Sequence, residues 1–487
     1  MSFVFNNSYA HLPPRFYVRQ PPLPVSAPRL VRLNRALAVE LGLDLSWLAS
    51  PEGIAVLAGN KVPEGAEPLA MAYAGHQFGG FVPQLGDGRA ILLGEILSPE
   101  GERFDIQLKG SGRTPFSRGG DGRAWLGPVL REYIMGEAMH ALDIPSTRAL
   151  AAVATGDPVY REGELPGAVL TRVARSHVRV GTFEYFAARR DTDALRQLAD
   201  YVIARHFPEA SQSDRPFRVL LDGVIRRQAD LIARWLAVGF IHGVMNTDNM
   251  SIAGETIDYG PCAFMDAYHP ASVYSSIDHG GRYAYGNQPQ IAHWNLVRLA
   301  ECLLPLLDEN QAKAMEEAQS AIDAFPGCFE ASRLERFRAK LGLAAALPED
   351  NDLIADLLQV MGESKADFTN GFRALCDAAA GSDAGFLAEF GDSRAAQEWL
   401  RRWRSRLQQE PVDVNLRTSR MRRANPAVIP RNHRVESALA AALQQDLGPL
   451  DKLLRVLASP WDDDAGSLPY RSPPKPDEVV RQTFCGT

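Results

Sequence analysis

Residues 242–260, HGVMNTDNMSIAGETIDYG, hold a dense set of side chains suited to chemistry on phosphate esters. Asn249 and Asp258 offer hard oxygen ligands of the kind that Mg²⁺ or Mn²⁺ prefers. Asp248, beside Asn249, is a carboxylate that can accept the proton of a hydroxyl group. The segment therefore predicts a site that binds a divalent metal together with nucleotide phosphates and activates a hydroxyl nucleophile.

The spacing of these residues differs from a pattern found in many small-molecule kinases, H-G-D-x-x-x-x-N. Aligned on Asn249, the place of the acid is taken by Val244, and the carboxylate stands instead at Asp248. A carboxylate at the shifted position can still act as a base if the acceptor enters from another direction. The alternative is an inert turn aspartate in a pseudokinase, with Asn249 and Asp258 as ordinary turn residues.

A lysine upstream could bind the phosphates, and a glutamate in the next helix could keep that lysine in place. Lys109 ends an alternating strand predicted at 103–109, and Glu132 lies in the helix that follows. Glu137 is a rival on the same helix. The alternatives are a solvated strand-end lysine and a surface glutamate, but their order along the chain favours an ion pair in an active site.

The loop at 110–123, GSGRTPFSRGGDGR, is rich in glycine and arginine. Glycine lets backbone amides approach a phosphate closely, and arginine donates two hydrogen bonds to it at once. Further along, Arg172 and Arg179 lie on or just after a strand predicted at 167–173, where they could add bidentate contacts. A mobile basic loop and salt-bridged surface arginines are the alternatives.

The segments that must position these groups follow one another in a definite order. A glycine turn and a strand at 84–97 precede the lysine strand, the glutamate helix at 128–142 and the strand at 167–173. A long helix at 218–240 then leads to the acidic loop, and 250–252 with 256–257 predict a short hairpin that sets Asn249 beside Asp258. Helices are also predicted at 28–48, 291–307 and 435–458. This order is that of a protein-kinase core.

We therefore expect an α+β, protein-kinase-like, two-lobed fold with an N-terminal extension and mainly helical C-terminal additions. The expected parts are an extension at 1–70, an N-lobe at 71–180, a C-lobe core at 181–290, a helical region at 291–458 and a mobile tail at 459–487.

The composition fits a folded protein of this kind and excludes some classes of binding partner. The chain has 487 residues and a net charge of −7, so no bulk attraction to nucleic acid is expected. No apolar run is long enough to cross a membrane. Five cysteines without metal-ligand spacing favour a reducing compartment, and we expect a cytoplasmic protein that acts as a monomer.

The chain closely resembles selenoprotein O and its bacterial relatives, the YdiU family. The resemblance runs from about Phe5 to the end of the chain. It rests on NNSYAHLPPRFY, YAGHQFGGFVPQLGDGRAILLGE, QLKGSGRTPFSRGGDGRA, HGVMNTDNMSIAGETIDYGPCAFMD, GRYAYGNQPQIAHWNL and RRANPAVIPRNH. The chain departs from the family at 125–129, where an arginine expected near Gly127 is absent.

This resemblance implies transfer of AMP from ATP to Ser, Thr or Tyr hydroxyls of proteins, with ATP flipped relative to ordinary kinases. It places the proton acceptor at Asp248 and the Mg²⁺ or Mn²⁺ ligands at Asn249 and Asp258, with Glu132 as the partner of the lysine. It implies ATP-binding roles for Gly86, Gly88, Arg89, Lys109, Asp121, Gly122, Arg172, Arg179 and Asp258.

The resemblance also bears on the tail and on other substrates. Cys485 corresponds to the selenocysteine of eukaryotic members, and Cys262 is its expected redox partner. Transfer of UMP from UTP with Mn²⁺ is ascribed to bacterial members. Three alternatives stay open: uridylylation, a γ-phosphate-transferring protein kinase and a non-catalytic nucleotide-binding pseudokinase.

Overall fold

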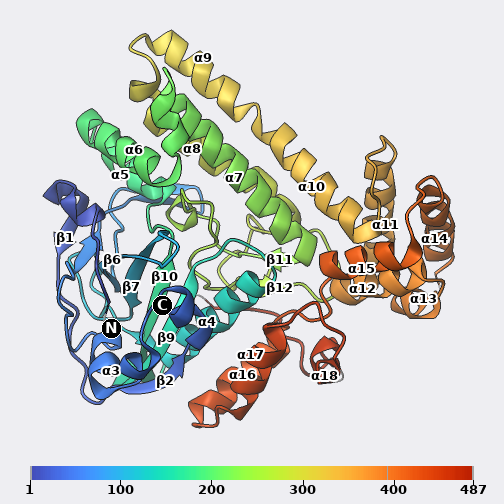
Figure 1. Ribbon diagram of the computed structural model, residues 1–487, viewed down its shortest axis with the longest axis horizontal. Coiled ribbons are helices and arrows are strands. Elements are labelled where there is room, and N and C mark those ends of the chain that lie inside the picture. Colours follow the sequence, from blue (N-terminus) through green and yellow to red (C-terminus); the bar gives the residue numbers. More distant parts are fainter. Residues whose placement is uncertain (1–2, 392, 465, 485–487) are drawn as a thin grey trace.

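The computed structural model describes residues 3–391, 393–464 and 466–484. Within them, an antiparallel sheet of eight strands in the order β1-β3-β6-β7-β10-β9-β2, with β8 paired to β10, packs against many helices. Figure 1 shows the sheet on one side, the long helices α7 and α8 beside it, and α11–α15 at the far end. The expected α+β class is confirmed.

The strands of this sheet are β1 (Tyr17–Arg19), β2 (Arg29–Leu33), β3 (Leu69–Met71), β6 (Ala90–Leu97), β7 (Arg103–Lys109), β8 (Ala124–Trp125), β9 (Arg148–Tyr160) and β10 (Glu164–Ala174). Two small sheets pair β4 (Gly75–Gln77) with β5 (Gly80–Val82), and β11 (Phe240–Ile241) with β12 (Ala263–Phe264). The predicted strand at 103–109 is confirmed to the residue, and its successive side chains point to opposite faces of the sheet.

We call residues 242–260 the catalytic loop, after their predicted role. The helices before it are α1 (Arg35–Glu40), α2 (Leu45–Leu48), α3 (Pro51–Leu57), α4 (Leu126–Ala141), α5 (Val180–Ala188), α6 (Thr192–His206) and α7 (Pro216–Val238). Pro216 starts α7 at its first position, and Gly239 ends it with a φ of 73°. A left-handed residue at a helix C-terminus is the usual role of glycine, so α7 stops where the catalytic loop begins.

The later helices are α8 (Gln288–Leu307), α9 (Gln311–Ile322), α10 (Phe325–Leu341), α11 (Asp350–Ser364), α12 (Phe368–Ala379), α13 (Ala384–Glu389), α14 (Arg394–Leu407), α15 (Val414–Ala424), α16 (Asn432–Leu443), α17 (Gly448–Leu457) and α18 (Leu468–Arg471). No helix among the described residues combines the length and the apolar composition needed to cross a membrane.

Two of the predicted helices are wrong in extent. The segment 28–48 begins as the strand β2, because it pairs with β9, and then forms two short helices, each capped by a polar side chain: Asn34 for α1 and Asp44 for α2. The segment 435–458 is divided into α16 and α17, since Gln445 takes a left-handed φ of 65° after α16 and Pro449 stands in the first turn of α17.

Three apolar clusters hold these elements together. The largest joins the inner face of the sheet to α4–α8 and to α16–α17. A second lies under the opposite face of the sheet, against α1–α3, and a third is built by α10–α15. The largest cluster includes Met245, Met250, Ile252 and Tyr259 of the catalytic loop, so the loop rests on a packed core.

Candidate active site

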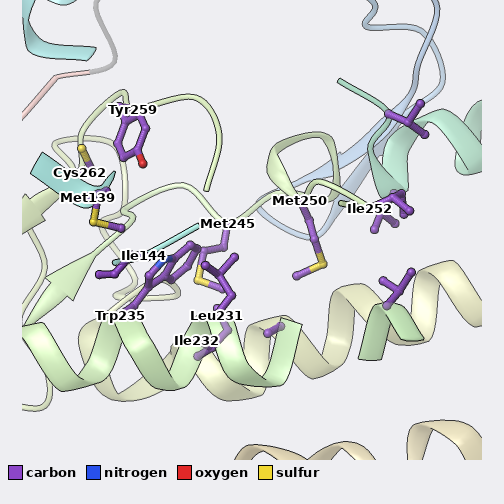
Figure 2. Close-up of a cluster of buried hydrophobic side chains, with 14 of the residues drawn as sticks. Met139, Ile144, Leu231, Ile232, Trp235, Met245, Met250, Ile252, Tyr259 and Cys262 are labelled. Atoms are coloured by element: carbon purple, nitrogen blue, oxygen red, sulfur yellow. The ribbon is translucent and has the colours of Figure 1, made fainter. Parts of the chain in front are cut away.

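Apolar residues interleaved with the polar ones anchor the catalytic loop. Figure 2 shows Met245 beside Trp235, a side chain of α7, and Met250 further along the same loop. Met250 is 5% exposed and Tyr259 2%. These side chains pack into the core, and Asp248, Asn249 and Asp258 between them line a cleft.

Hydrogen bonds fix the path of the loop further. His242, fully buried, bonds through Nε2 to the carbonyl oxygen of Ile257 at 2.9 Å. Asn249 donates from Nδ2 to the carbonyl oxygen of Val244 at 2.9 Å. The bond of His242 therefore joins the start of the loop to its end, and the bond of Asn249 leaves its side-chain oxygen free to accept from another group.

The predicted hairpin between 250 and 257 is wrong. Ser251 pairs in an antiparallel bridge with Arg179, and Thr256 pairs in a parallel bridge with Ser146. Each half of the segment thus finds its backbone partners in a neighbouring element rather than in the other half. Asn249 and Asp258 nevertheless line one cleft, as predicted.

Asp258 is held by three cationic side chains. Its Oδ1 accepts from Nζ of Lys109 at 2.9 Å and from a guanidinium nitrogen of Arg172 at 2.7 Å, and its Oδ2 accepts from Arg179 at 2.6 Å. Burial alone would favour the neutral acid, but the charges of Arg172, Lys109 and Arg179 hold the pKa of Asp258 well below its usual range. The carboxylate is therefore ionised, and three cations converge on one point.

Glu132 supplies the second anion of this cluster. Its Oε2 accepts from Lys109 at 2.7 Å, and its Oε1 accepts from Nε of Arg172 at 2.8 Å. The rival Glu137 faces away and binds Arg148 through both of its oxygens, at 2.9 and 2.8 Å. The pairing of Lys109 with Glu132 is present in the structure.

Asp248 has a very different environment. It is 7% exposed, and its Oδ2 accepts from Nε2 of Gln77 at 3.1 Å. Burial raises the pKa of Asp248 to about 6, against the opposing influence of Gln77 and of Arg179. A carboxyl group poised near neutral pH is suited to accept and release a proton.

These groups share one cleft of about 600 Å³. Glu132 lies just outside its lining, behind Lys109. The other predicted site residues all line it: Gly86, Gly88, Arg89, Lys109, Asp121, Gly122, Arg172, Arg179, Asp248, Asn249 and Asp258. The structure thus brings together residues that are spread over more than 170 positions of the chain.

Close backbone packing explains the glycines at the rim of this cleft. A Cβ at Gly86 would lie 2.3 Å from the ring of Phe116, and one at Gly122 would lie 2.2 Å from the backbone of Gly112. Gly122 also has a φ of 68°, a conformation that favours glycine. Larger residues would push the loop 110–123 out of the cleft.

Sequence reasoning missed several residues of the cleft, and two of them, Arg161 and Gln77, contact predicted site residues. Arg161, just after β9, bonds through NH1 to Asp121 at 2.8 Å, and Gln77 comes from the small hairpin β4–β5. Neither carries a local signal, because a lone arginine in a turn and a lone glutamine in a short strand are common on protein surfaces.

The tail also reaches the site. Thr483 donates from Oγ1 to the carbonyl oxygen of Pro261 at 2.5 Å and from its backbone to Tyr274 at 2.7 Å. Cys485 lies outside the described residues, so its pairing with the buried Cys262 stays a prediction.

The donor set fits a divalent metal. Among the described residues, no three or more His, Cys, Asp or Glu side chains cluster closely enough to form an all-protein metal site. Asn249 and Asp258 offer two hard oxygen donors at the wall of the cleft, and Mg²⁺ commonly takes its remaining ligands from phosphates and water.

Comparisons with known proteins agree with this chemistry. The sequence model of the family described as "Protein adenylyltransferase SelO" matches residues 1–458. The chain belongs to the SelO family. As a member it is a nucleotidyltransferase, and a nucleotide is its substrate.

Curated relatives match along the whole chain. Proteins named "Protein nucleotidyltransferase YdiU" from Bradyrhizobium diazoefficiens and Methylorubrum extorquens are each 62% identical, and one from Rhodopseudomonas palustris is 60% identical. Each alignment covers 100% of this chain and 99% of the relative. The resemblance inferred from the motifs is thereby confirmed.

Proposed function

We propose that this SelO-family protein transfers AMP from ATP to Ser, Thr or Tyr hydroxyl groups of proteins and releases pyrophosphate. The observation that carries the proposal is the presence of two unlike carboxylates in one cleft. Asp258 sits among three cations, at a place suited to phosphates, whereas Asp248 is poised to exchange a proton.

The cationic cluster supports nucleotide binding at the Asp258 end. The carboxylate of Asp258 is paired with Lys109, Arg172 and Arg179, and the same donors bind phosphate oxygens equally well. Arg89 and the glycine-rich loop with Gly122 line the same cleft and add further donors around the phosphates. We infer that these groups bind and orient the triphosphate.

In the proposed reaction the acceptor hydroxyl oxygen bonds to the α-phosphorus of ATP. The bond from that phosphorus to the oxygen bridging to the β-phosphate breaks, and its electron pair leaves with pyrophosphate. Asp248 takes the hydroxyl proton. Lys109, with its partner Glu132, and the two arginines stabilise the charge on the phosphate oxygens.

Asn249 and Asp258 would hold the metal ion, which we propose to be Mg²⁺ or Mn²⁺. When bound, such an ion neutralises phosphate charge and polarises the reacting phosphoryl group. The hydrogen bond from Asn249 to Val244 keeps the amide oxygen of Asn249 oriented for this role. Asp258 is kept ionised, as a ligand must be.

We also propose that the fold is a protein-kinase-like core with the boundaries predicted from sequence. The sequence of strand β7 with its lysine, helix α4 with its glutamate, and the loop framed by β11 and β12 supports this arrangement. In ordinary kinases, too, the lysine of this pair comes from a strand and the glutamate from a helix.

Two labelled forms of ATP test the proposed function. The protein is incubated with Mg²⁺ or Mn²⁺, a mixed protein extract, and ATP labelled on either the α- or the γ-phosphate. Retention of the α label alone on protein supports AMP transfer. Retention of the γ label alone would make the enzyme a kinase and overturn the proposal. A parallel reaction with α-labelled UTP shows which nucleotide is preferred.

A further inference from the structure

The small hairpin β4–β5 lies directly against the catalytic loop. The backbone nitrogen of His76 donates to Oγ1 of Thr247 at 2.7 Å, and that of Phe78 donates to Oδ1 of Asn246 at 3.1 Å. Between these two contacts, the side chain of Gln77 reaches Oδ2 of Asp248 at 3.1 Å. Three consecutive residues of the hairpin thus contact three consecutive residues of the loop.

The base of the hairpin is anchored independently of Asp248. Glu184 of α5 binds Nδ1 of His76 at 2.5 Å and also accepts from the hydroxyl group of Thr247. Glu184 is 4% exposed, so this bridge lies in a dry environment where hydrogen bonds are strong. Its effect is to fix the hairpin and the loop to the same helix.

Packing limits how the Asp248 carboxylate can lie. A Cβ at Gly75 would come within 2.6 Å of Oδ1, so this oxygen rests against the bare backbone of the hairpin. Oδ1 is buried and has no hydrogen-bond partner among the described residues. The other oxygen, Oδ2, is the one that carries a hydrogen bond, and its donor is Gln77.

We propose that Gln77 is a positioning residue, which holds Oδ2 of Asp248 in the orientation that receives the proton of the acceptor hydroxyl. A carboxylate oxygen has two lone pairs, so Oδ2 can accept from Gln77 and from a substrate hydroxyl together. The proposal rests on the proposed role of Asp248 as proton acceptor. In the reaction, the O–H bond of the acceptor breaks and a bond between that proton and Oδ2 forms, while Gln77 stays unchanged.

A graded pair of substitutions tests this role. Gln77→Met keeps the shape of the side chain and removes the donor, whereas Gln77→Glu places a second carboxylate against Asp248. The apparent kcat for transfer of α-labelled AMP, at a fixed concentration of protein extract, should fall about tenfold or more in the first variant and further in the second. The KM for ATP should stay within about twofold, because Gln77 is not placed at the cationic cluster.

The matched control is Gln319→Ala on α9, which also removes an amide that donates to a carboxylate, that of Asp323 at 2.7 Å. It should leave kcat and KM unchanged. A normal kcat in Gln77→Met would overturn the positioning role. So would a loss of kcat that comes with a matching rise in KM and a lower Tm, because that pattern indicates a damaged hairpin.

Asp248→Ala separates this inference from the function on which it rests. If Asp248→Ala transfers AMP normally, Asp248 is not the proton acceptor and both ideas fail. If Asp248→Ala is inactive and Gln77→Met retains wild-type kcat, the proposed function stands and only the role of Gln77 is refuted.

Discussion

Asp248 and Asp258 lie on one loop and line one cleft, yet their surroundings are opposite. Asp258 receives hydrogen bonds from Lys109, Arg172 and Arg179, and its pKa is held well below the usual range. Asp248 receives one from the neutral side chain of Gln77, and burial raises its pKa to about 6.

The difference shows how one loop can supply two kinds of carboxylate. A carboxylate among cations stays ionised and keeps a fixed charge, which suits a ligand for metal and phosphates. A carboxylate that is buried with few donors can gain and lose a proton near neutral pH, which suits a base. The proposed roles follow from the surroundings and not from the residue type, which is the same.

The largest expected effect is that of Asp258→Asn. It removes the charge on which three cations converge, so AMP transfer should fall by about a thousandfold or more and metal-dependent ATP binding should weaken. Labelled-ATP transfer and ATP binding with and without Mg²⁺ measure both. Chelation of divalent metal from the wild-type enzyme should likewise stop transfer, without any change in sequence.

The control for Asp258→Asn is Asp356→Asn, which breaks an exposed pair with Arg402 and should leave activity unchanged. Normal metal-dependent ATP binding in Asp258→Asn would contradict the proposed difference between Asp258 and Asp248, because Asp258 would then not be a metal ligand.

Asp248→Asn should have the next largest effect. Loss of the proton acceptor should lower kcat by about 10²- to 10⁴-fold while ATP binding is retained, because the cationic cluster is intact. Single-turnover transfer and equilibrium ATP binding separate the two quantities. Lost ATP binding in this variant would place Asp248 with Asp258 and remove the contrast between them.

Arg161→Ala should have a smaller effect, on the binding end of the cleft. Arg161 holds Asp121 at the rim, where Asp121 is 44% exposed in its side chain. An ion pair this exposed is worth about 1 kcal/mol or less, so the KM for ATP should rise no more than about fivefold, with kcat unchanged. A large loss of kcat would show that the rim takes part in the chemical step.

Glu255→Gln should have the smallest effect on activity and sharpens the comparison most directly. Burial raises the pKa of Glu255 to about 8, as it raises that of Asp248, but Glu255 is absent from the lining of the cleft. Activity should therefore stay within about twofold of wild type. A strong loss would mean that burial within this loop, and not position in the cleft, marks a functional carboxylate.

The raised pKa of Glu255 also predicts how the stability of the fold depends on pH. Its pKa is raised in the folded state above the ordinary value of 4.5, so the folded protein binds this proton more tightly than the unfolded chain. The resulting contribution to stability is present in full below about pH 4.5 and is lost as pH rises towards 8. The Tm of the wild type should show this decline, and Glu255→Gln should lack that part of it.

Where local pattern carries the information, sequence reasoning succeeded. Alternation of side chains located β7 and put Lys109 at its end, and the helical run placed Glu132 one element later. The choice of Glu132 over Glu137 needed the family resemblance and the order of elements, since both lie on the same helix. The structure shows Glu137 engaged by Arg148.

Where the backbone had a choice of partners, sequence reasoning failed. The segment 250–257 could pair with itself, but its two halves instead bridge to Arg179 and Ser146. Likewise 28–33 has a helical pattern and forms a strand because β9 offers an edge to pair with. Local propensity is weak compared with such tertiary contacts.

The sequence by itself determined which chemical groups the protein owns, and in what order: a lysine, a glutamate, a basic glycine loop, and an acidic loop with Asp248, Asn249 and Asp258. Only the tertiary structure decided the contacts, the burial and the pKa of each group. Gln77 and Asp248 are 171 positions apart, and Lys109 and Asp258 are 149 apart. The charge, burial and hydrogen bonding that set a pKa come from such distant neighbours, which no local pattern specifies.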